Sequence, residues 1–149
     1  MGVMDSNNGE QGTSVVEFAV ILLVLFPLLF GIIEFGFIVY NQVMITNACR
    51  EGARYGIMSR ADKRTVVEIR DKVKEYSDNI LLLSFDDLAV LTVDPIGRKA
   101  DDPPDASRPL DSLVFGDVLT VTVTYPYTYL FLPFAQPLEL SATVMMKYE

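Results

Sequence analysis

The chain has no histidine, and only one of its 149 residues, Cys49, is a cysteine. Without histidine it lacks the commonest general base and a leading metal ligand, so neither a Ser-His-Asp nor a Cys-His catalytic system can form. A single cysteine cannot form an internal disulfide and says nothing about the redox compartment. Nucleotide motifs of the GxxxxGK[ST] and GxGxxG kinds are absent as well. We therefore expect a protein that is not an enzyme, with no cofactor, metal or small-molecule substrate.

Positive charge is scarce, because 12 Lys and Arg residues stand against 20 Asp and Glu, a net charge of −8. Binding to nucleic acid needs a basic surface, so nucleic acid is not an expected partner. All the basic residues follow residue 40, and Arg50 is the first of them. The positive-inside rule, taken alone, would place the C-terminal part of the chain in the cytoplasm.

What the chain does have is a long apolar run near its start. Residues 18–33 carry no charge, and the run resumes from Phe35 to Tyr40. A helix from Val15 to Tyr40 is long enough to cross a bilayer, which takes about 20 residues. Glu17 and Glu34 would then lie about 25 Å apart, near the two interfaces of a hydrocarbon layer about 30 Å thick. The sequence therefore predicts a single membrane span with the lipid bilayer as a partner.

Two features of this run need comment. Pro27 lies in its middle and predicts a kink in the helix. A cleaved signal peptide is the competing interpretation, but it would have a basic leader and an apolar stretch of about 7–15 residues. The leader, residues 1–12, contains two acidic residues and no basic one, so we favour a retained anchor.

The rest of the chain predicts a small domain. The helix is expected to continue over Asn41–Met58, with Glu51 and Arg54 as an ion pair, while two glycines nearby favour close packing. A second, amphipathic helix begins at the capping box Thr65–Glu68, with an apolar stripe at three- and four-residue steps: Val66, Ile69, Val73, Tyr76 and Ile80.

Three stretches predict strands of an antiparallel sheet. The first is the short apolar run Leu88–Val93, and the others, Val118–Tyr125 and Leu138–Tyr148, alternate apolar and polar residues with period two. The predicted fold class is therefore α+β: a long N-terminal transmembrane helix that continues into a small α/β domain with a second helix and about three strands. We divide the chain into a polar leader (1–12), the helix with its extension (13–60) and a small C-terminal domain (61–149).

Two connecting segments allow more than one interpretation. Residues 96–112 are rich in Pro, Asp and Gly and predict a mobile loop, whose acidic residues suit a solvated surface better than a calcium site: Asp101, Asp102, Asp105 and Asp111. The aromatic segment 125–134 is expected to cap the core, although an exposed contact patch or a membrane contact is also open. Cys49 is expected to be a buried small hydrophobe, the alternative being a disulfide between copies.

Three stretches on the long helix resemble a known family. They are Gly12–Phe18 with its glycine and Glu17, Phe30–Gly36 with Glu34, and Thr46–Gly56 with its run Arg-Glu-Gly-Ala-Arg. Together they are similar to the TadE-like family, minor pseudopilins of bacterial tight adherence pilus systems. The resemblance covers about residues 12–60 in detail.

The resemblance implies how the protein is processed and placed. A prepilin peptidase would cleave after Gly12 and leave Thr13 as the new N-terminus, while Glu17, Phe18 and Glu34 would serve recognition and assembly. The family signature on the helix would be Arg50, Glu51, Gly52, Ala53 and Arg54. The protein would lie in the bacterial inner membrane or in an extracellular pilus, with its C-terminal domain outside the cytoplasm. We prefer this orientation to that of the charge rule, because long domains translocate largely regardless of charge.

Two functions follow from these observations. The first is a pilin-like structural subunit of a tight adherence pilus or type II-related secretion apparatus, whose partners are the peptidase, other pilin-like subunits and assembly platform proteins. The second is an uncleaved single-pass scaffold of a secretion complex. An anchored metal-dependent enzyme using the acidic loop is the least favoured.

Overall fold

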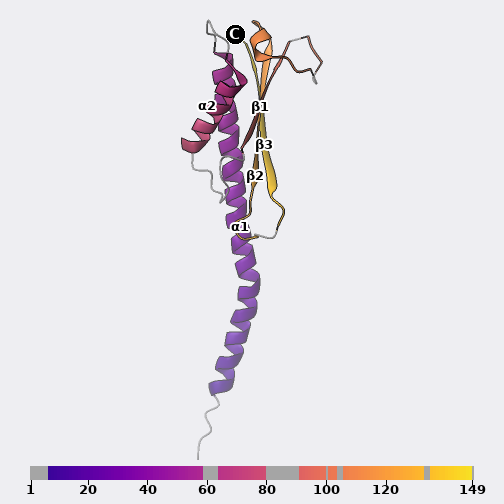
Figure 1. Cartoon of the computed structure of the whole chain (residues 1–149). Helices are drawn as coiled ribbons and strands as arrows, with labels where there is room; N and C mark the ends of the chain where they lie inside the picture. The colour runs from indigo at the N-terminus through magenta and orange to yellow at the C-terminus, as the bar shows by residue number, and fades with distance from the viewer. Residues whose placement is uncertain are drawn as a thin grey trace, which may run out of the picture. The chain divides into compact units, whose positions relative to one another are not determined.

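The computed structural model describes residues 7–58, 64–79, 91–99, 101–103, 106–132 and 135–148 (Figure 1). Its elements follow in the order α1 (Asn7–Ile57), α2 (Val66–Asn79), β1 (Thr92–Arg98), the 3-10 helix η2 (Leu110–Ser112), β2 (Val118–Tyr127) and β3 (Leu138–Lys147). The chain divides into two compact units, Met1–Gly36 and Phe37–Glu149. The predicted α+β class, with a long N-terminal helix and a three-stranded antiparallel sheet, is confirmed.

Helix α1 is 51 residues long and contains the whole apolar run. In the first unit its apolar side chains are largely exposed, and none of its most apolar 18-residue window is buried within the protein. So long an exposed apolar surface is unfavourable in water and suits lipid chains. Among the described residues, α1 is the one helix long and apolar enough to cross a membrane. Pro27 lies inside it, and the kink there stays a prediction.

The capping box at the start of α2 is confirmed. The hydroxyl oxygen of Thr65 accepts a hydrogen bond from the Glu68 backbone N–H at 3.2 Å. In return, the Glu68 carboxylate accepts one from the Thr65 backbone N–H at 2.7 Å. These two bonds satisfy backbone donors that the first turn of a helix leaves without partners, so α2 begins at the next residue, Val66.

The apolar stripe of α2 also faces the core as predicted. Ile69 and Val73 are fully buried, and Val66 and Tyr76 are partly buried against the same cluster. Ile80, the last member of the stripe, lies outside the described residues. The helix is tied to the neighbouring strand by Arg70, whose Nε donates to the Val93 carbonyl oxygen at 2.7 Å.

The sheet has the order β1-β2-β3 with both pairs antiparallel. Strand β2 alternates as its sequence predicts, with threonines on the outer face and buried residues on the inner face: Leu119, Val121, Val123, Tyr125 and Tyr127. Because successive side chains of a strand point to opposite faces, this places one apolar face of the central strand toward the helices.

The position of the first strand was predicted wrongly. The run Leu88–Val93 was expected to end at Asp94-Pro95, whereas β1 passes through these residues and ends at Arg98. Proline is tolerated because β1 is an edge strand. The carbonyl oxygen of Val93 accepts from Arg70, and that of Gly97 accepts from the Arg108 backbone N–H, so both point away from β2. Alternate residues of a strand point their backbone groups to the same side, so those of Pro95 also point away from β2. The missing N–H of Pro95 therefore costs the sheet no bond.

The mobile loop expected over residues 96–112 is shorter than predicted, because both of its ends belong to regular elements. Ile96, Gly97 and Arg98 belong to β1, and residues 110–112 form η2. Leu110 and Leu113 are buried at either end of that turn and pack in the core. Their burial ties the end of the segment to the domain.

The interpretation of the aromatic segment as a cap on the core is confirmed for its first part. Tyr125 and Tyr127 have no exposed surface, and the strand continues two residues beyond its predicted end. Pro126 fits within β2 because the pairing with β1 stops at Thr124, so this residue has only β3 beside it. The later part of the segment is different, since Leu132 is 59% exposed.

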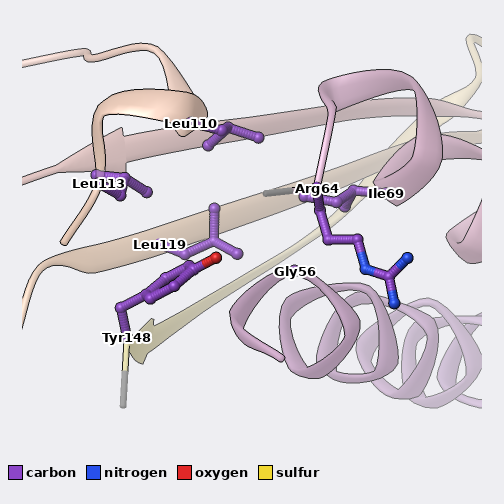
Figure 2. A pocket seen from close by; sticks show the side chains of 7 residues that line it. All are labelled: Gly56, Arg64, Ile69, Leu110, Leu113, Leu119 and Tyr148. Atoms are coloured by element: carbon purple, nitrogen blue, oxygen red, sulfur yellow. The ribbon is translucent and has the colours of Figure 1, made fainter. Parts of the chain in front are cut away.

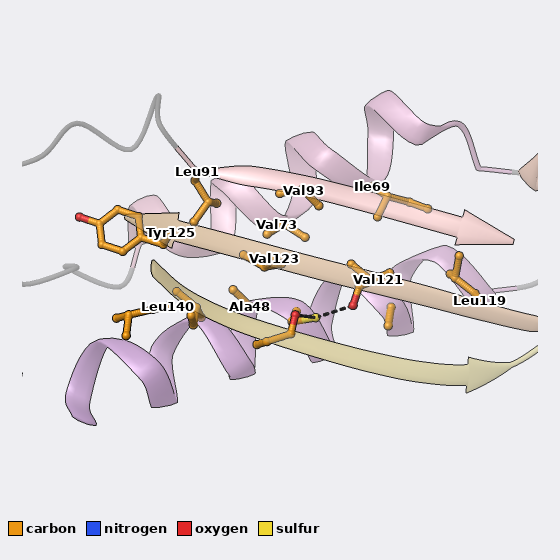
Figure 3. Packing of buried hydrophobic residues seen from close by; sticks show 14 of the residues in the cluster. Ala48, Ile69, Val73, Leu91, Val93, Leu119, Val121, Val123, Tyr125 and Leu140 are labelled. Carbon is orange, nitrogen blue, oxygen red and sulfur yellow. Dashed lines mark hydrogen bonds between the residues drawn. The ribbon is translucent and has the colours of Figure 1, made fainter. Parts of the chain in front are cut away.

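The core lies between the sheet and a face of α1 made of small residues (Figure 3). Ala48, Cys49 and Ala53 are buried there, together with Gly52 and Gly56. A Cβ atom at Gly52 would collide with Cγ2 of Val73, and one at Gly56 would collide with Leu119. The close packing expected of these glycines is therefore confirmed, and it brings α1 against both α2 and β2.

Cys49 occupies the centre of this face. Its Sγ lies 3.0 Å from the Val121 carbonyl oxygen, to which it donates, and 3.4 Å from that of Ala142. Burial raises the pKa of the thiol. The buried role predicted for Cys49 is confirmed, and the closed environment disfavours a disulfide between copies.

We expect Gly52→Ala to lower the free energy of unfolding by about 1–2 kcal/mol. Overpacking typically costs about 1–3 kcal/mol, and the better helix propensity of alanine returns up to about 1 kcal/mol. Val73 is β-branched and fully buried, so it has little freedom to move aside. Urea unfolding of the detergent-solubilised full chain, followed by tyrosine signals, measures the change. Gly36→Ala is the control, because nothing lies within 4 Å of its position; equal effects of the two variants would contradict the close contact.

We expect Cys49 to react slowly with a water-soluble thiol reagent in the folded protein and rapidly in denaturant. Burial keeps the reagent away from the sulfur atom, and the raised pKa of the thiol lowers the fraction of reactive thiolate. A matched control is Met145→Cys combined with Cys49→Ala, because Met145 is 64% exposed. If native Cys49 reacts as fast as the control, the packing of α1 on the sheet is wrong.

Candidate functional site on helix α1

The four residues at the expected processing position are all inside α1 and all exposed. Gly12, Thr13, Glu17 and Phe18 follow five helical residues that begin at Asn7. Nothing lies within 4 Å of the position that a Cβ of Gly12 would take. The structure leaves this stretch open to a partner, and residues 1–6 of the leader lie outside the described residues.

The second acidic position on α1 differs from the first. Glu17 is exposed, whereas Glu34 is only 6% exposed although Ile33 and Phe35 beside it are exposed. A buried carboxylate needs hydrogen-bond or charge partners, because burial of an isolated charge is costly. The step of 17 residues from Glu17 to Glu34 corresponds to about 25 Å of helix.

The signature residues 50–54 lie on α1 beyond the apolar run, within the unit that contains the sheet. Gly52 and Ala53 are buried, so they provide the small surface on which α2 and the sheet pack. Glu51 and Arg54 form the predicted pair through two bonds, 2.9 Å from Nε and 2.7 Å from Nη2. Arg54 holds the pKa of the Glu51 carboxyl below its usual value. Arg50 is exposed to solvent.

Two polar residues that the sequence interpretation did not single out lie where α1 enters the domain, and one of them bonds to the sheet. Gln42 donates from Nε2 to the Ser141 carbonyl oxygen at 2.8 Å, and Asn41 beside it is fully buried. The only sequence signal is their place, as a polar pair immediately after the apolar run. They fix the point at which α1 enters the domain.

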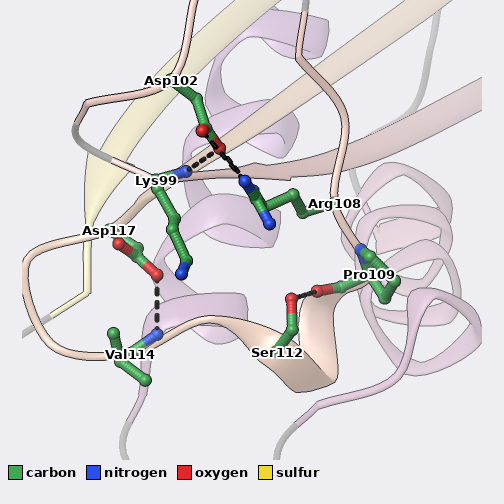
Figure 4. A network of polar contacts seen from close by, with 7 residues as sticks. All are labelled: Lys99, Asp102, Arg108, Pro109, Ser112, Val114 and Asp117. Atoms are coloured by element: carbon green, nitrogen blue, oxygen red, sulfur yellow. Dashed lines mark hydrogen bonds and ion pairs between the residues drawn. The ribbon is translucent and has the colours of Figure 1, made fainter.

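The acidic loop forms internal contacts (Figure 4). The carboxylate of Asp102 accepts from the backbone N–H of Lys99 at 3.2 Å and pairs with both Nε and Nη2 of Arg108. Arg108 keeps the pKa of this carboxyl low. Asp117 accepts from the Val114 backbone N–H at 2.9 Å and closes the turn before β2. These carboxylates thus stabilise the loop itself.

The described residues give the calcium alternative no support. Among them no group of three or more His, Cys, Asp or Glu side chains is arranged to hold a metal ion. Asp105 lies outside these residues.

One pocket of the domain lies at the C-terminal end of α1 (Figure 2). The space inside it has no room for a water molecule, far less than a ligand pocket needs. The lining is mostly apolar, and the guanidinium of its one charged residue, Arg64, lies 4.0 Å from the centre of the Tyr55 ring. A cation over an aromatic face is stabilising, while the Nε of Arg64 is buried with no hydrogen-bond partner among the described residues. The pocket is a packing gap, and nothing in its geometry points to a substrate.

Comparison with known proteins supports a function for α1. The family model described as TadE-like protein matches residues 12–54. No curated protein and no solved structure gave a significant match to the chain. The matched segment begins at Gly12, ends at Arg54 and includes both acidic positions, so it covers every site residue that the resemblance implied. The chain is thus similar to the TadE-like family over residues 12–54, a segment that contains the apolar run and the residues 50–54 beyond it.

Proposed function

We propose that this protein is a pilin-like structural subunit of a tight adherence pilus or a related secretion apparatus. The observation that carries the proposal is the exposed apolar helix, entered by an exposed Glu17 five residues after Gly12, inside the segment that matches the family. Such a helix presents one carboxylate at the edge of hydrocarbon, where a charge is costly unless it is paired. In this proposal α1 anchors the protein in the inner membrane, the domain of residues 37–149 lies outside the cytoplasm, and the protein has no catalytic role.

Processing after Gly12 is the first step that we propose. The peptide bond between Gly12 and Thr13 lies in the second turn of α1, and a peptidase needs it in an extended form. Glycine weakens a helix by about 1 kcal/mol relative to alanine, and helix ends fray readily. The bond therefore lies where local unwinding of the helix costs little free energy. Cleavage there leaves a free ammonium on Thr13.

Assembly through the new N-terminus is the second step. Thr13 and Glu17 are one helical turn apart on the same face of α1. In a bundle of such helices the ammonium of one subunit can pair with the Glu17 carboxylate of the next. Two charges taken out of water are tolerated only when they are paired, so the pair would set the axial position of each subunit.

The partners follow from these steps. The prepilin peptidase would contact Gly12–Phe18, and other pilin-like subunits would pack along the apolar part of α1. Assembly platform proteins are further partners, and the exposed Arg50 is a charged residue available to them.

An uncleaved single-pass scaffold is the second candidate. Two observations favour it: the leader carries no basic residue, and α1 begins at Asn7 and continues without a break through Gly12 and Thr13. In this case residues 1–12 stay attached, no ammonium forms beside Glu17, and the domain alone would bind partners.

Expression in cells that contain a prepilin peptidase decides between the two candidates. We expect intact-mass measurement and N-terminal sequencing of the membrane-purified protein to give a chain that starts at Thr13, shorter by the 12 leader residues. Gly12→Val should abolish this trimming, because a branched side chain replaces the residue at the cleaved bond. Gly31→Ala, far along the same helix, should be trimmed normally. A full-length chain in peptidase-containing cells would reject the pilin-like proposal in favour of the scaffold.

Glu17→Gln tests the assembly step separately. We expect this variant to be trimmed but to be lost from cross-linked assemblies, since the amide cannot neutralise the ammonium of Thr13. The conservative Glu17→Asp should retain part of the assembly, because it keeps the charge on a shorter side chain. Normal assembly of the Gln variant would disprove the charge pair and leave the trimming result untouched.

A further inference from the structure

The two ends of the small domain can be told apart by its contacts with α1. At one end Leu119 lies against Gly56, near the C-terminus of the helix. At the other end Ser141 bonds to Gln42, where the helix enters the domain. Strand β2 runs from the first end to the second, so the connection between β2 and β3 lies at the end where α1 enters.

This connection is apolar and partly exposed. Its patch consists of residues 129–132, of which Phe131 is 42% and Leu132 is 59% exposed. No charged residue occurs from Tyr125 to Leu138, although charged residues make up 21% of the chain. The opposite end carries the ion pair of Asp102 with Arg108 and the capping carboxylate of Asp117. The connection between β1 and β2 thus carries these charges, whereas the connection between β2 and β3 carries none.

The patch is also held firmly by the core. Tyr129 packs edge-on against the fully buried Tyr127, with ring centres 5.8 Å apart and planes at 81°. Leu130 is partly buried against the same cluster, as are Phe37 and Ile38 of α1. Core contacts of Tyr129 and Leu130 thus attach the first half of the patch to the domain.

The chain itself indicates what covers the patch. Phe37 is the first residue of the domain and follows directly on the exposed apolar helix that is suited to lipid. Tryptophan and tyrosine are enriched where membrane proteins meet the headgroup region, and exposed Phe and Leu side chains of interfacial helices are buried at the boundary between headgroups and acyl chains. A charge-free, aromatic patch at the end of the domain from which the apolar segment leaves matches that position.

We propose that residues 129–132 are a membrane-contact patch that enters the interfacial region of the bilayer beside the point where α1 leaves it. The contact gives the domain a second attachment to the lipid surface and restricts its rotation about the helix. It requires only that α1 spans a bilayer, so it holds whether or not the leader is removed and whichever side the domain faces.

Tryptophan fluorescence tests the proposal directly, because the chain has no tryptophan of its own. Leu132→Trp places a probe in the patch, and Phe115→Trp places a control probe at the opposite end, where Phe115 is 82% exposed. Each full-length variant is reconstituted in phosphatidylcholine vesicles, with and without lipids brominated near the headgroup. Slow labelling of Cys49 confirms that both variants are folded.

We expect the Leu132→Trp variant to emit at shorter wavelength than the control, to lose fluorescence to the brominated lipids and to resist aqueous iodide. The Phe115→Trp variant should show the reverse. Equal iodide quenching of both probes, with no lipid quenching at Leu132→Trp, would overturn the proposal. Protection of the Leu132→Trp probe from both quenchers would also overturn it, because a protein neighbour would then cover the patch.

Discussion

The close approach of one face of α1 to the sheet is the constraint on which the domain depends. Small residues at three- and four-residue steps allow it, and at Gly52 and Gly56 even a methyl group would overlap a neighbouring side chain. Because protein interiors are packed as densely as organic crystals, such a contact leaves no space for a larger side chain. The last turns of α1 are thus a structural part of the domain as well as the continuation of the apolar helix.

This packing gives the family signature a physical meaning. Of its five residues, Gly52 and Ala53 are buried and supply a surface without bulk, while Glu51 and Arg54 form an ion pair beside them. An exposed pair of this kind contributes little stability, about 0–1 kcal/mol. The glycine and alanine therefore matter most for the fold, and Arg50, exposed on the same helix, is the member left for interactions with other molecules.

Charge is distributed in the chain in a way that serves the membrane. The apolar helix keeps one exposed carboxylate at its start, and the connection between β2 and β3 carries none. In the connection between β1 and β2, Asp102 pairs with Arg108 and accepts from the Lys99 backbone N–H. A connection without charge favours the proposed membrane contact, because charged groups lose hydration as they approach hydrocarbon.

The sequence by itself determined the long helix, the cap of α2, the alternation of β2 and β3 and the match to a known family. Each of these depends on residues close together in the chain, through helical or strand periodicity or a local side-chain bond. The limits of β1 were different: Pro95 argues locally against a strand, and only its place at the sheet edge, with Arg70 and Arg108 bonded beside it, permits one. The site divides in the same way, since the positions proposed for processing and for the family signature are short motifs in the sequence. The bonds from the Cys49 thiol to Val121 and from Gln42 to Ser141 arise only when distant segments meet. Tertiary structure decided those features because long-range contacts leave no periodic trace in the chain.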